Sequence, residues 1–326
     1  MATWREIHLA AAAEAGRAHR ELAVDTSARI DPFAALVASG IVTLRRPLEH
    51  ASGLYLPAPG GAGGGVLVNV LHPASRQRYT AAHELAHHRR DRRAVIDTET
   101  EWLGRDDHNH SDRERFAEAF ASWFLMPRGL ILATIARLGF TVGALAPAEV
   151  YQLGLELGTS YRATANRLRG LGLVDQSVER RLLASTPRAV KDALGARRAA
   201  RDLRRDVWHV ASDHVQRHLR PQEGDVLVVD ERETATAGFR WIPGPSTRLQ
   251  FVDDDYGSGP DDGLIGGQVV HRFRFLVRNA GEAELRLSLS RPWEARVIGE
   301  RTIPVAADAR PSPGIVDSRQ LTISRS

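Results

Sequence analysis

The chain of 326 residues is 43% hydrophobic and 26% charged, with a formal charge of +4, which is typical of a globular protein with two or three domains. It has no cysteine, so disulfide bonds and thiolate metal ligands are excluded. No window reaches the roughly 18 consecutive apolar residues that cross a bilayer, and Arg and Glu interrupt the apolar run that a signal peptide needs. We therefore expect a cytoplasmic protein without membrane contact.

The N-terminal part predicts two helices and two strands. Apolar periodicity indicates an amphipathic helix over the first 25 residues and a short helix over 31–41 that ends at a glycine. Residues 41–47 (IVTLRRP) and 66–70 (VLVNV) predict strands. The glycine run at 57–65 lacks the Lys and Ser/Thr of a phosphate-binding loop, so it predicts a hairpin loop.

Helical patterns continue to about residue 205. The clearest cover 76–93 and 113–126, separated by the charged segment 97–112. The character changes at 196–206 (ARRAARDLRRD), an arginine-rich helix end or linker. Alternating strands then follow at 225–231, 271–279, 283–290 and 301–306.

This change predicts an α+β chain in which a mostly helical part with a small sheet precedes an all-β part. We place the boundaries so that the parts are residues 1–140, a helical segment 141–200, a β domain 207–310 and a C-terminal tail 311–326.

The segment Tyr79–Asp91 (YTAAHELAHHRRD) contains the pattern His-Glu-x-x-His. Four positions in a helix bring His83 and His87 to one face, where both imidazoles can reach one ion. Glu84 lies beside the first histidine, where it suits a general base that later protonates the leaving amine. The pattern also arises by chance, and an ordinary amphipathic helix is the alternative.

A catalytic zinc site needs a third protein ligand and an open position. The helix over 113–126 offers Glu114 as that ligand and Glu118, four residues on, as an outer carboxylate that orients a ligand histidine. A solvated helix face is the alternative for both glutamates. The apolar stripes of the two helices suit close packing; they are Ala82, Leu85 and Ala86, and Ala117, Phe120, Ala121, Phe124 and Leu125.

The stretch RYTAAHELAHH, the gap of 27 residues from His87 to Glu114 and the pattern ExxxExFAxxxLMP together resemble the ImmA/IrrE family of metallo-endopeptidases, over about residues 1–185. The resemblance implies a zincin-like fold with zinc, or manganese as an alternative, held by His83, His87 and Glu114, and Glu84 as the catalytic residue. It also implies a helix-turn-helix repressor as substrate, cleaved to derepress stress or mobile-element genes. The chain departs from the family at Glu118, where Asn or Asp is more frequent, and at Ala86, which replaces a frequent glycine.

Other polar residues near the motif have weaker cases. We interpret His88 as a surface residue, because it points to another side of the helix. His108 and His110 lie in a polar segment that is either a loop or a lid. Tyr151 and Tyr161 are either packing residues or candidates for stabilising an oxyanion.

Residues 149–174 have the helix, short turn, helix pattern of a helix-turn-helix. The second predicted helix carries Arg162, Arg167 and Arg169, so one interpretation is DNA binding and the other is a packing unit that completes the domain. Arginine enrichment does not decide between them, because Lys191 is the only lysine and the bias extends along the whole chain.

Three loop-like stretches interrupt the β domain: Thr234–Trp241, Asp261–Gln268 and Arg291–Glu294. With GDVLVV before them and FRFLVRNAGEAELRLSL between them, they resemble the binding loops of chagasin-like cysteine-protease inhibitors, which are immunoglobulin-like sandwiches. The first loop departs from the family, which usually has Asn-Pro there. The candidate partner-binding residues are Thr236, Gly238, Phe239, Trp241, Gly266, Gly267, Arg291, Pro292 and Trp293.

Two functions therefore stay open. The first is an intracellular zinc endopeptidase whose β-sandwich recognises a protein or peptide, or senses a signal. The second is a binding or inhibitor protein that acts through the sandwich loops and carries an inactive zincin domain. Trp241 and Trp293 are either interface residues or packing residues in both cases.

Overall fold

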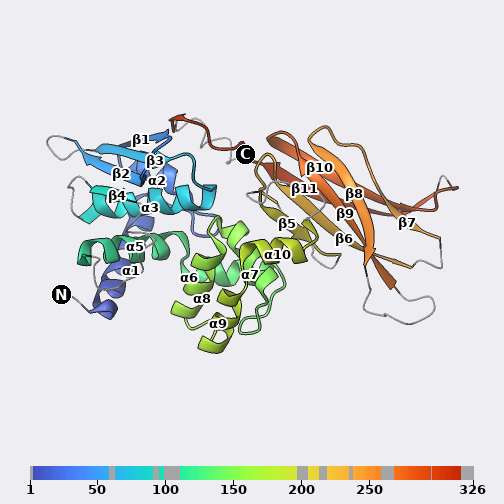
Figure 1. The fold of residues 1–326 in the computed structure, drawn as a ribbon, viewed down its shortest axis with the longest axis horizontal. Helices are drawn as coiled ribbons and strands as arrows, with labels where there is room; N and C mark the ends of the chain where they lie inside the picture. Colours follow the sequence, from blue (N-terminus) through green and yellow to red (C-terminus); the bar gives the residue numbers. More distant parts are fainter. Residues whose placement is uncertain are drawn as a thin grey trace. The chain divides into compact units, whose positions relative to one another are not determined.

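The computed structural model describes residues 3–58, 63–90, 95–98, 111–196, 205–212, 219–234, 238–257, 268–294 and 296–316 (Figure 1). The chain folds into two compact units. One comprises residues 1–136, 157–175 and 311–326, and the other comprises 137–156 and 176–310. Segments of the two units therefore alternate along the chain, because residues 157–175 of the first unit lie between the two segments of the second. The four-part division expected from the sequence stays a prediction.

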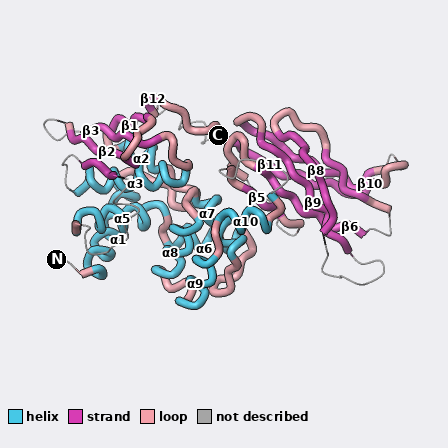
Figure 2. The backbone as a smooth tube through the Cα atoms, viewed as in Figure 1, coloured by secondary structure: helices cyan, strands magenta, loops and turns pink. Residues whose placement is uncertain are grey.

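Four helices and a sheet form the main part of the first unit. The helices are α1 (Trp4–Glu21), α2 (Pro32–Ala38), α3 (Ala74–Arg90) and α5 (Asp112–Leu125), which confirm the four predicted helical segments. Helix α3 packs between the sheet and α5, and α5 packs in turn on α1 (Figure 2). No single described helix is long and apolar enough to span a membrane; only α5 together with α6 (Arg128–Arg137), bent by 40°, passes that test.

Capping side chains set where the first two helices begin. The Thr3 hydroxyl accepts a hydrogen bond from the Glu6 amide, and the Glu6 carboxylate accepts one from the Thr3 amide. The Asp31 carboxylate accepts from the Phe33 amide at 2.9 Å, with Pro32 at the first helical position. Helix α1 buries the face formed by Ile7, Ala11, Ala15 and Ala18.

The sheet of the first unit has the strand order β12-β1-β3-β2-β4. Its strands are β1 (Ile41–Arg46), β2 (Ala51–Pro57), β3 (Gly64–Asn69), β4 (Val95–Thr98) and β12 (Gly314–Ile315), of which only β1 and β3 were predicted. Strands β1 and β3 are parallel, and the other pairs are antiparallel. The predicted C-terminal tail thus contributes an edge strand, and the Val316 amide bonds to the Thr43 carbonyl oxygen at 2.9 Å.

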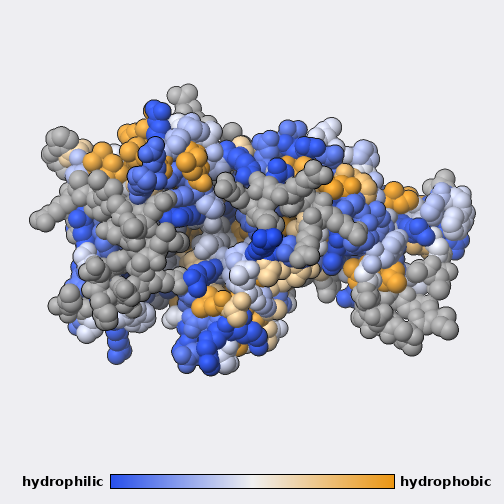
Figure 3. Space-filling view, in the orientation of Figure 1, coloured by the Kyte–Doolittle hydropathy of each residue, from blue (hydrophilic) through white to orange (hydrophobic). Residues whose placement is uncertain are grey.

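The two faces of this sheet differ in burial. Tyr55, Val66 and Val68 are fully buried on the face that α3 covers. On the other face Val42 is 61% exposed and Ile315 is 68% exposed, and Figure 3 shows hydrophobic surface over these strands.

Helices α7 (Pro147–Leu157) and α8 (Tyr161–Gly170) follow one another along the chain, with a turn between them in which Gly158 has φ +68°. The helix-turn-helix arrangement of this segment stays a prediction. The Arg167 side chain in α8 is buried. Its Nε donates to the Met126 carbonyl oxygen at 3.0 Å, and its guanidinium lies 3.6 Å from the centre of the Trp123 ring. Burial lowers the pKa of Arg167 to about 10. These contacts of Arg167 favour the interpretation of the segment as a packing unit, and DNA binding through Arg162 and Arg169 stays a prediction.

Arg167→Ala is expected to destabilise the first unit by about 3 kcal/mol, because a charge-assisted hydrogen bond and a desolvated cation–π contact are lost together. Arg162→Ala is the matched control on the same helix; its side chain is exposed, so a change within about 0.5 kcal/mol is expected. Urea denaturation of both variants tests this expectation. Equal, small effects would show that the Arg167 contacts do not support the fold.

The second unit is a two-sheet sandwich flanked by α9 (Gln176–Ala184) and α10 (Pro187–Ala193). One sheet has the order β5-β6-β9-β8, and the other has the order β11-β10-β7. The strands are β5 (Val207–Val210), β6 (Val226–Thr234), β7 (Arg240–Pro243), β8 (Leu249–Gly257), β9 (Gln268–Val277), β10 (Gly281–Ser290) and β11 (Val297–Ala307). The four predicted strands are confirmed, and β5, β7 and β8 are additional.

Side-chain hydrogen bonds attach these additional strands. In α7, the Gln152 amide bonds to both the carbonyl oxygen of Val207 and the amide of His209, at 2.9 and 3.0 Å, and so pairs with β5. Strand β8 carries three consecutive aspartates, a composition that disfavours strands. Buried Arg274 of β9 offsets this unfavourable composition, because its guanidinium donates hydrogen bonds to the carboxylates of Asp253 and Asp255 at 2.9 Å each.

Candidate metal centre and loop cluster

Helices α3 and α5 bring His83, His87 and Glu114 to one point. The Nε2 atoms of the two histidines are 3.0 Å apart, and they lie 3.2 and 3.4 Å from the Glu114 Oε2 atom. Neighbouring ligand atoms around a tetrahedral zinc ion lie about 3.3 Å apart, given bonds of about 2.0–2.1 Å. The donor set and its spacing therefore fit a metal ion. Within the described ranges, no second group of three His, Asp or Glu side chains converges in this way.

Local structure explains this convergence. The hydroxyl of Ser111 caps α5 and accepts from the Glu114 amide at 3.3 Å, which places Glu114 in the first turn. The facing residues of the two helices, including Ala82, Ala86 and Ala121, are fully buried, so small side chains permit close packing. The predicted apolar stripes are thereby confirmed.

The three side chains are also coupled electrostatically. Burial alone would raise the pKa of Glu114, but hydrogen bonds and positive charge from His83 and His87 outweigh it and hold that pKa well below its usual range. Burial lowers the pKa of His87, although its hydrogen bond with Glu114 opposes the shift. The burial of His87 favours the neutral imidazole, which is the form that binds metals.

Glu84 lies beside His83 and is fully buried. Its carboxylate faces Gly53 of β2, where an added Cβ atom would lie 2.8 Å from Oε1. Gly53 was not identified from the sequence, because β2 was not predicted as a strand and the close approach of Glu84 depends on tertiary packing. The catalytic role of Glu84 stays a prediction.

Glu118 lies one turn after Glu114 and is partly exposed. Its carbonyl oxygen accepts a hydrogen bond from the Tyr79 hydroxyl at 3.2 Å, and the Tyr79 ring lies 6.4 Å from the His83 ring. The predicted role of the Glu118 carboxylate in orienting a histidine stays a prediction.

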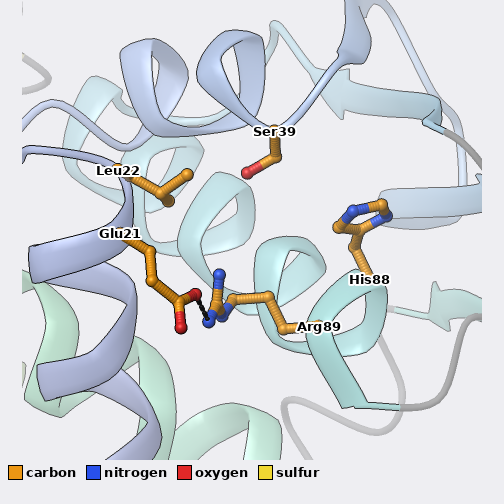
Figure 4. Close-up of a pocket in the computed structure, with 5 residues that line it drawn as sticks. All are labelled: Glu21, Leu22, Ser39, His88 and Arg89. Carbon is orange, nitrogen blue, oxygen red and sulfur yellow. Dashed lines mark hydrogen bonds and ion pairs between the residues drawn. The ribbon is translucent and has the colours of Figure 1, made fainter.

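His88 is not a surface residue, contrary to the sequence interpretation. It is only 8% exposed, and its Nδ1 lies 2.9 Å from the Tyr55 hydroxyl, because β2 covers that side of α3. His88 also lines a pocket of about 260 Å³, with Glu21, Leu22, Ser39 and Arg89 (Figure 4). Arg89 bonds to Glu21 there at 2.6 Å, and His83 and His87 do not line this pocket.

The remaining polar candidates lie elsewhere. Tyr151 is buried, and its hydroxyl donates to Asp206 at 2.9 Å and accepts from the Val207 amide. This engagement within the second unit supports its role as a packing residue. Tyr161 begins α8 and is buried too. His108 and His110 lie outside the described residues.

The loop ends of β6, β7, β10 and β11 bring several predicted binding residues together. An added Cβ on Gly238 would lie 3.0 Å from the Trp293 ring, and the Arg291 guanidinium lies 4.4 Å from the centre of the Phe239 ring. Trp293 is 72% exposed, and Pro292 is exposed beside it.

Trp241 differs from Trp293 because it packs against the sandwich core. Its amide donates to Glu233 at 2.6 Å, and its indole donates to the Arg232 carbonyl oxygen at 3.2 Å. Of the two tryptophans, only Trp293 is therefore strongly exposed. Thr236, Gly266 and Gly267 lie outside the described residues.

A polar cluster that sequence reasoning missed lies next to these loops. The His271 imidazole bonds to Glu233 of β6 and Asp254 of β8 at 2.6 Å each, and the Tyr256 ring stacks on it at 4.2 Å. Burial alone lowers the pKa of His271, but the hydrogen bonds and charges of the two carboxylates outweigh it and raise the pKa. The cluster joins three strands that lead to the loops.

The raised pKa predicts that His271 stabilises the sandwich in acid. The stabilisation is fully present below the ordinary pKa of 6.5 and is lost as the pH rises through the folded-state pKa. His271→Gln is therefore expected to cost about 2 kcal/mol at pH 6, the scale of a charge-assisted hydrogen bond, and less at pH 8.5.

Thermal unfolding of the full chain at both pH values measures this difference. Burial raises the pKa of Glu231 to about 6, but Glu231 titrates in both proteins and its contribution cancels. A cost that is the same at both pH values would contradict the expectation.

The first unit has the architecture of a zincin-like metallopeptidase domain, and the second unit holds an immunoglobulin-like sandwich. Family comparisons identify both. Residues 38–169 match the IrrE N-terminal-like domain, and residues 220–306 match the chagasin family of peptidase inhibitors. The chain thus carries an IrrE N-terminal-like domain and a chagasin-family domain.

Solved structures align with 32% of the chain. The cysteine protease inhibitor EhICP2 from Entamoeba histolytica is 18% identical and aligns over 96% of its length, with a TM-score of 0.29. Amebosin is 17% identical over 97% of its length, with a TM-score of 0.27. PbICP-C in complex with falcipain-2 is 13% identical over 90% of its length, with a TM-score of 0.21. The search of curated proteins found no match.

Proposed function

We propose that the chain is a zinc-dependent endopeptidase that acts in the cytoplasm. The observation that carries the proposal is the convergence of the His83, His87 and Glu114 ligand atoms within 4.8 Å of one another, with Glu84 buried next to His83. Two imidazoles and one carboxylate are the donor set of many catalytic zinc sites, and they leave a position open. Manganese is a less suitable ion, because it prefers more oxygen ligands.

His83, His87 and Glu114 would hold the ion, which when bound supplies a Lewis acid for the peptide carbonyl group. Glu84 would take the proton from the attacking water and deliver it to the leaving amine. The donor spacing and the buried position of Glu84 support this division of roles.

The proposed substrate is a helix-turn-helix transcriptional repressor, whose cleavage derepresses stress or mobile-element genes. The match to the IrrE N-terminal-like domain supports a peptidase of this kind. The chagasin-like sandwich would recognise the substrate or sense a signal. Exposed Trp293 and the Arg291–Phe239 pair at its loop end offer an aromatic surface for such a partner.

The test incubates the purified full chain with zinc and with repressors encoded near its gene, and detects fragments by mass spectrometry. Cleavage of one repressor at a defined bond supports the proposal. No cleavage of any of them, with zinc bound, would contradict the repressor assignment.

A second candidate is a binding or inhibitor protein with an inactive zincin domain. The observation that favours it is the chagasin-family match over residues 220–306 together with the 72% exposure of Trp293. Trp293→Ala should then abolish inhibition of a papain-like protease by the full chain, whereas Trp241→Phe, at a packing position, should retain it.

A further inference from the structure

Strand β2 passes close to the catalytic face of α3. Thr80 and Glu84 are one turn apart on α3 and share the side that faces Gly53. An added Cβ atom at position 53 would lie 2.4 Å from the Thr80 Cγ2 atom, 2.8 Å from the Glu84 Oε1 atom and 3.2 Å from the Leu67 carbonyl oxygen. The first two distances are shorter than real Cβ atoms tolerate.

Space, and not backbone conformation, therefore requires glycine at this position. The φ angle of Gly53 is not positive, so other residues could adopt its conformation. Gly53 pairs with Val68 of β3 and Asp97 of β4, which holds it in the sheet interior. Glycine weakens a strand interior, and its use there indicates a close approach by another group.

We propose that Gly53 is a positioning residue for the peptidase reaction, because the missing side chain leaves the space in which the Glu84 carboxylate lies. The inference rests on the proposed function. It adds a residue on the sheet, 31 positions before Glu84 along the chain, to a site otherwise built from α3 and α5.

Gly53→Ala is expected to displace the Glu84 carboxylate without disturbing the three side chains proposed to bind the metal. The backbone oxygen of Leu67 is held in the sheet, whereas the Glu84 carboxylate ends a flexible side chain and has to move. His83, His87 and Glu114 do not supply any of the three atoms nearest to the added Cβ. A displacement of about 1 Å can lower the rate about 100-fold.

The experiment compares the wild-type chain, Gly53→Ala and the double variant Gly53→Ala/Thr80→Ser. Thr80→Ser removes the methyl group at 2.4 Å but leaves the contact with Glu84. We expect Gly53→Ala to lower kcat about 100-fold, with KM and zinc stoichiometry unchanged. The double variant should recover melting temperature but not kcat. Wild-type kcat in Gly53→Ala, or full recovery of kcat by Thr80→Ser, would overturn the proposal.

A crystal structure of Gly53→Ala gives a readout that does not depend on activity. The Glu84 carboxylate should be displaced while His83, His87 and Glu114 keep their positions. An unmoved carboxylate would overturn the role of Gly53 even if the wild type cleaves peptides. A displaced carboxylate in a chain that cleaves nothing would support the positioning role and contradict the proposed function instead.

Discussion

Glu84→Gln is expected to abolish peptide cleavage while the chain still binds one zinc ion. The amide has nearly the shape of the carboxylate, so it fits the space next to Gly53, but it cannot accept a proton from water. General acid–base groups contribute about 10²–10⁴-fold to a rate, and a loss of at least that size is expected. Mass spectrometry of the products and elemental analysis of the protein measure the two quantities.

The same change at Glu49 is the matched control, because that side chain is exposed on the connection between β1 and β2. Glu49→Gln should cleave at the wild-type rate. Full peptidase activity in Glu84→Gln would contradict the general-base role.

His83→Ala is expected to lose the metal. The three donor atoms of His83, His87 and Glu114 lie within 4.8 Å of one another, so removing one leaves two ligands and an incomplete site. Loss of groups that only orient a ligand lowers metal affinity about 10–100-fold, so loss of a ligand should exceed that range. Elemental analysis should give one zinc ion per wild-type chain and none per variant chain.

His88→Ala is the matched control on the same helix. It removes a buried imidazole that bonds to Tyr55, so it should lower stability but retain zinc. Zinc retained by His83→Ala would contradict the ligand assignment. If elemental analysis finds no zinc in the wild-type chain, the result would favour the second candidate, a binding protein with an inactive zincin domain.

Much of the metal centre could be predicted from the sequence, because helix geometry is local. A spacing of four residues places His83 and His87 on one face in any helix, and apolar stripes at helical spacing indicate which faces pack. Helix geometry could not connect Glu114 with His87, because 27 residues separate them. The resemblance to a peptidase family supports their assignment to one site.

Burial of individual polar residues could not be predicted in this way. His88 has its partner Tyr55 33 residues earlier in the chain, and Arg167 has its partner Met126 41 residues earlier. Periodicity shows which residues share a face of a helix, but it does not show what covers that face. The predicted surface position of His88 was wrong for this reason, and the two interpretations of Arg167, DNA contact and packing, could not be separated from the sequence.

Sequence alone thus determined the helical spacing of His83 and His87, the apolar faces of α3 and α5, and the change from helices to strands, because each depends on neighbours within a few residues. Tertiary structure decided the pairing of β12 with β1, the cluster around His271 and the closeness of Gly53 to Glu84. Each of these joins atoms from separate elements, and the space between such elements is set only when the chain packs.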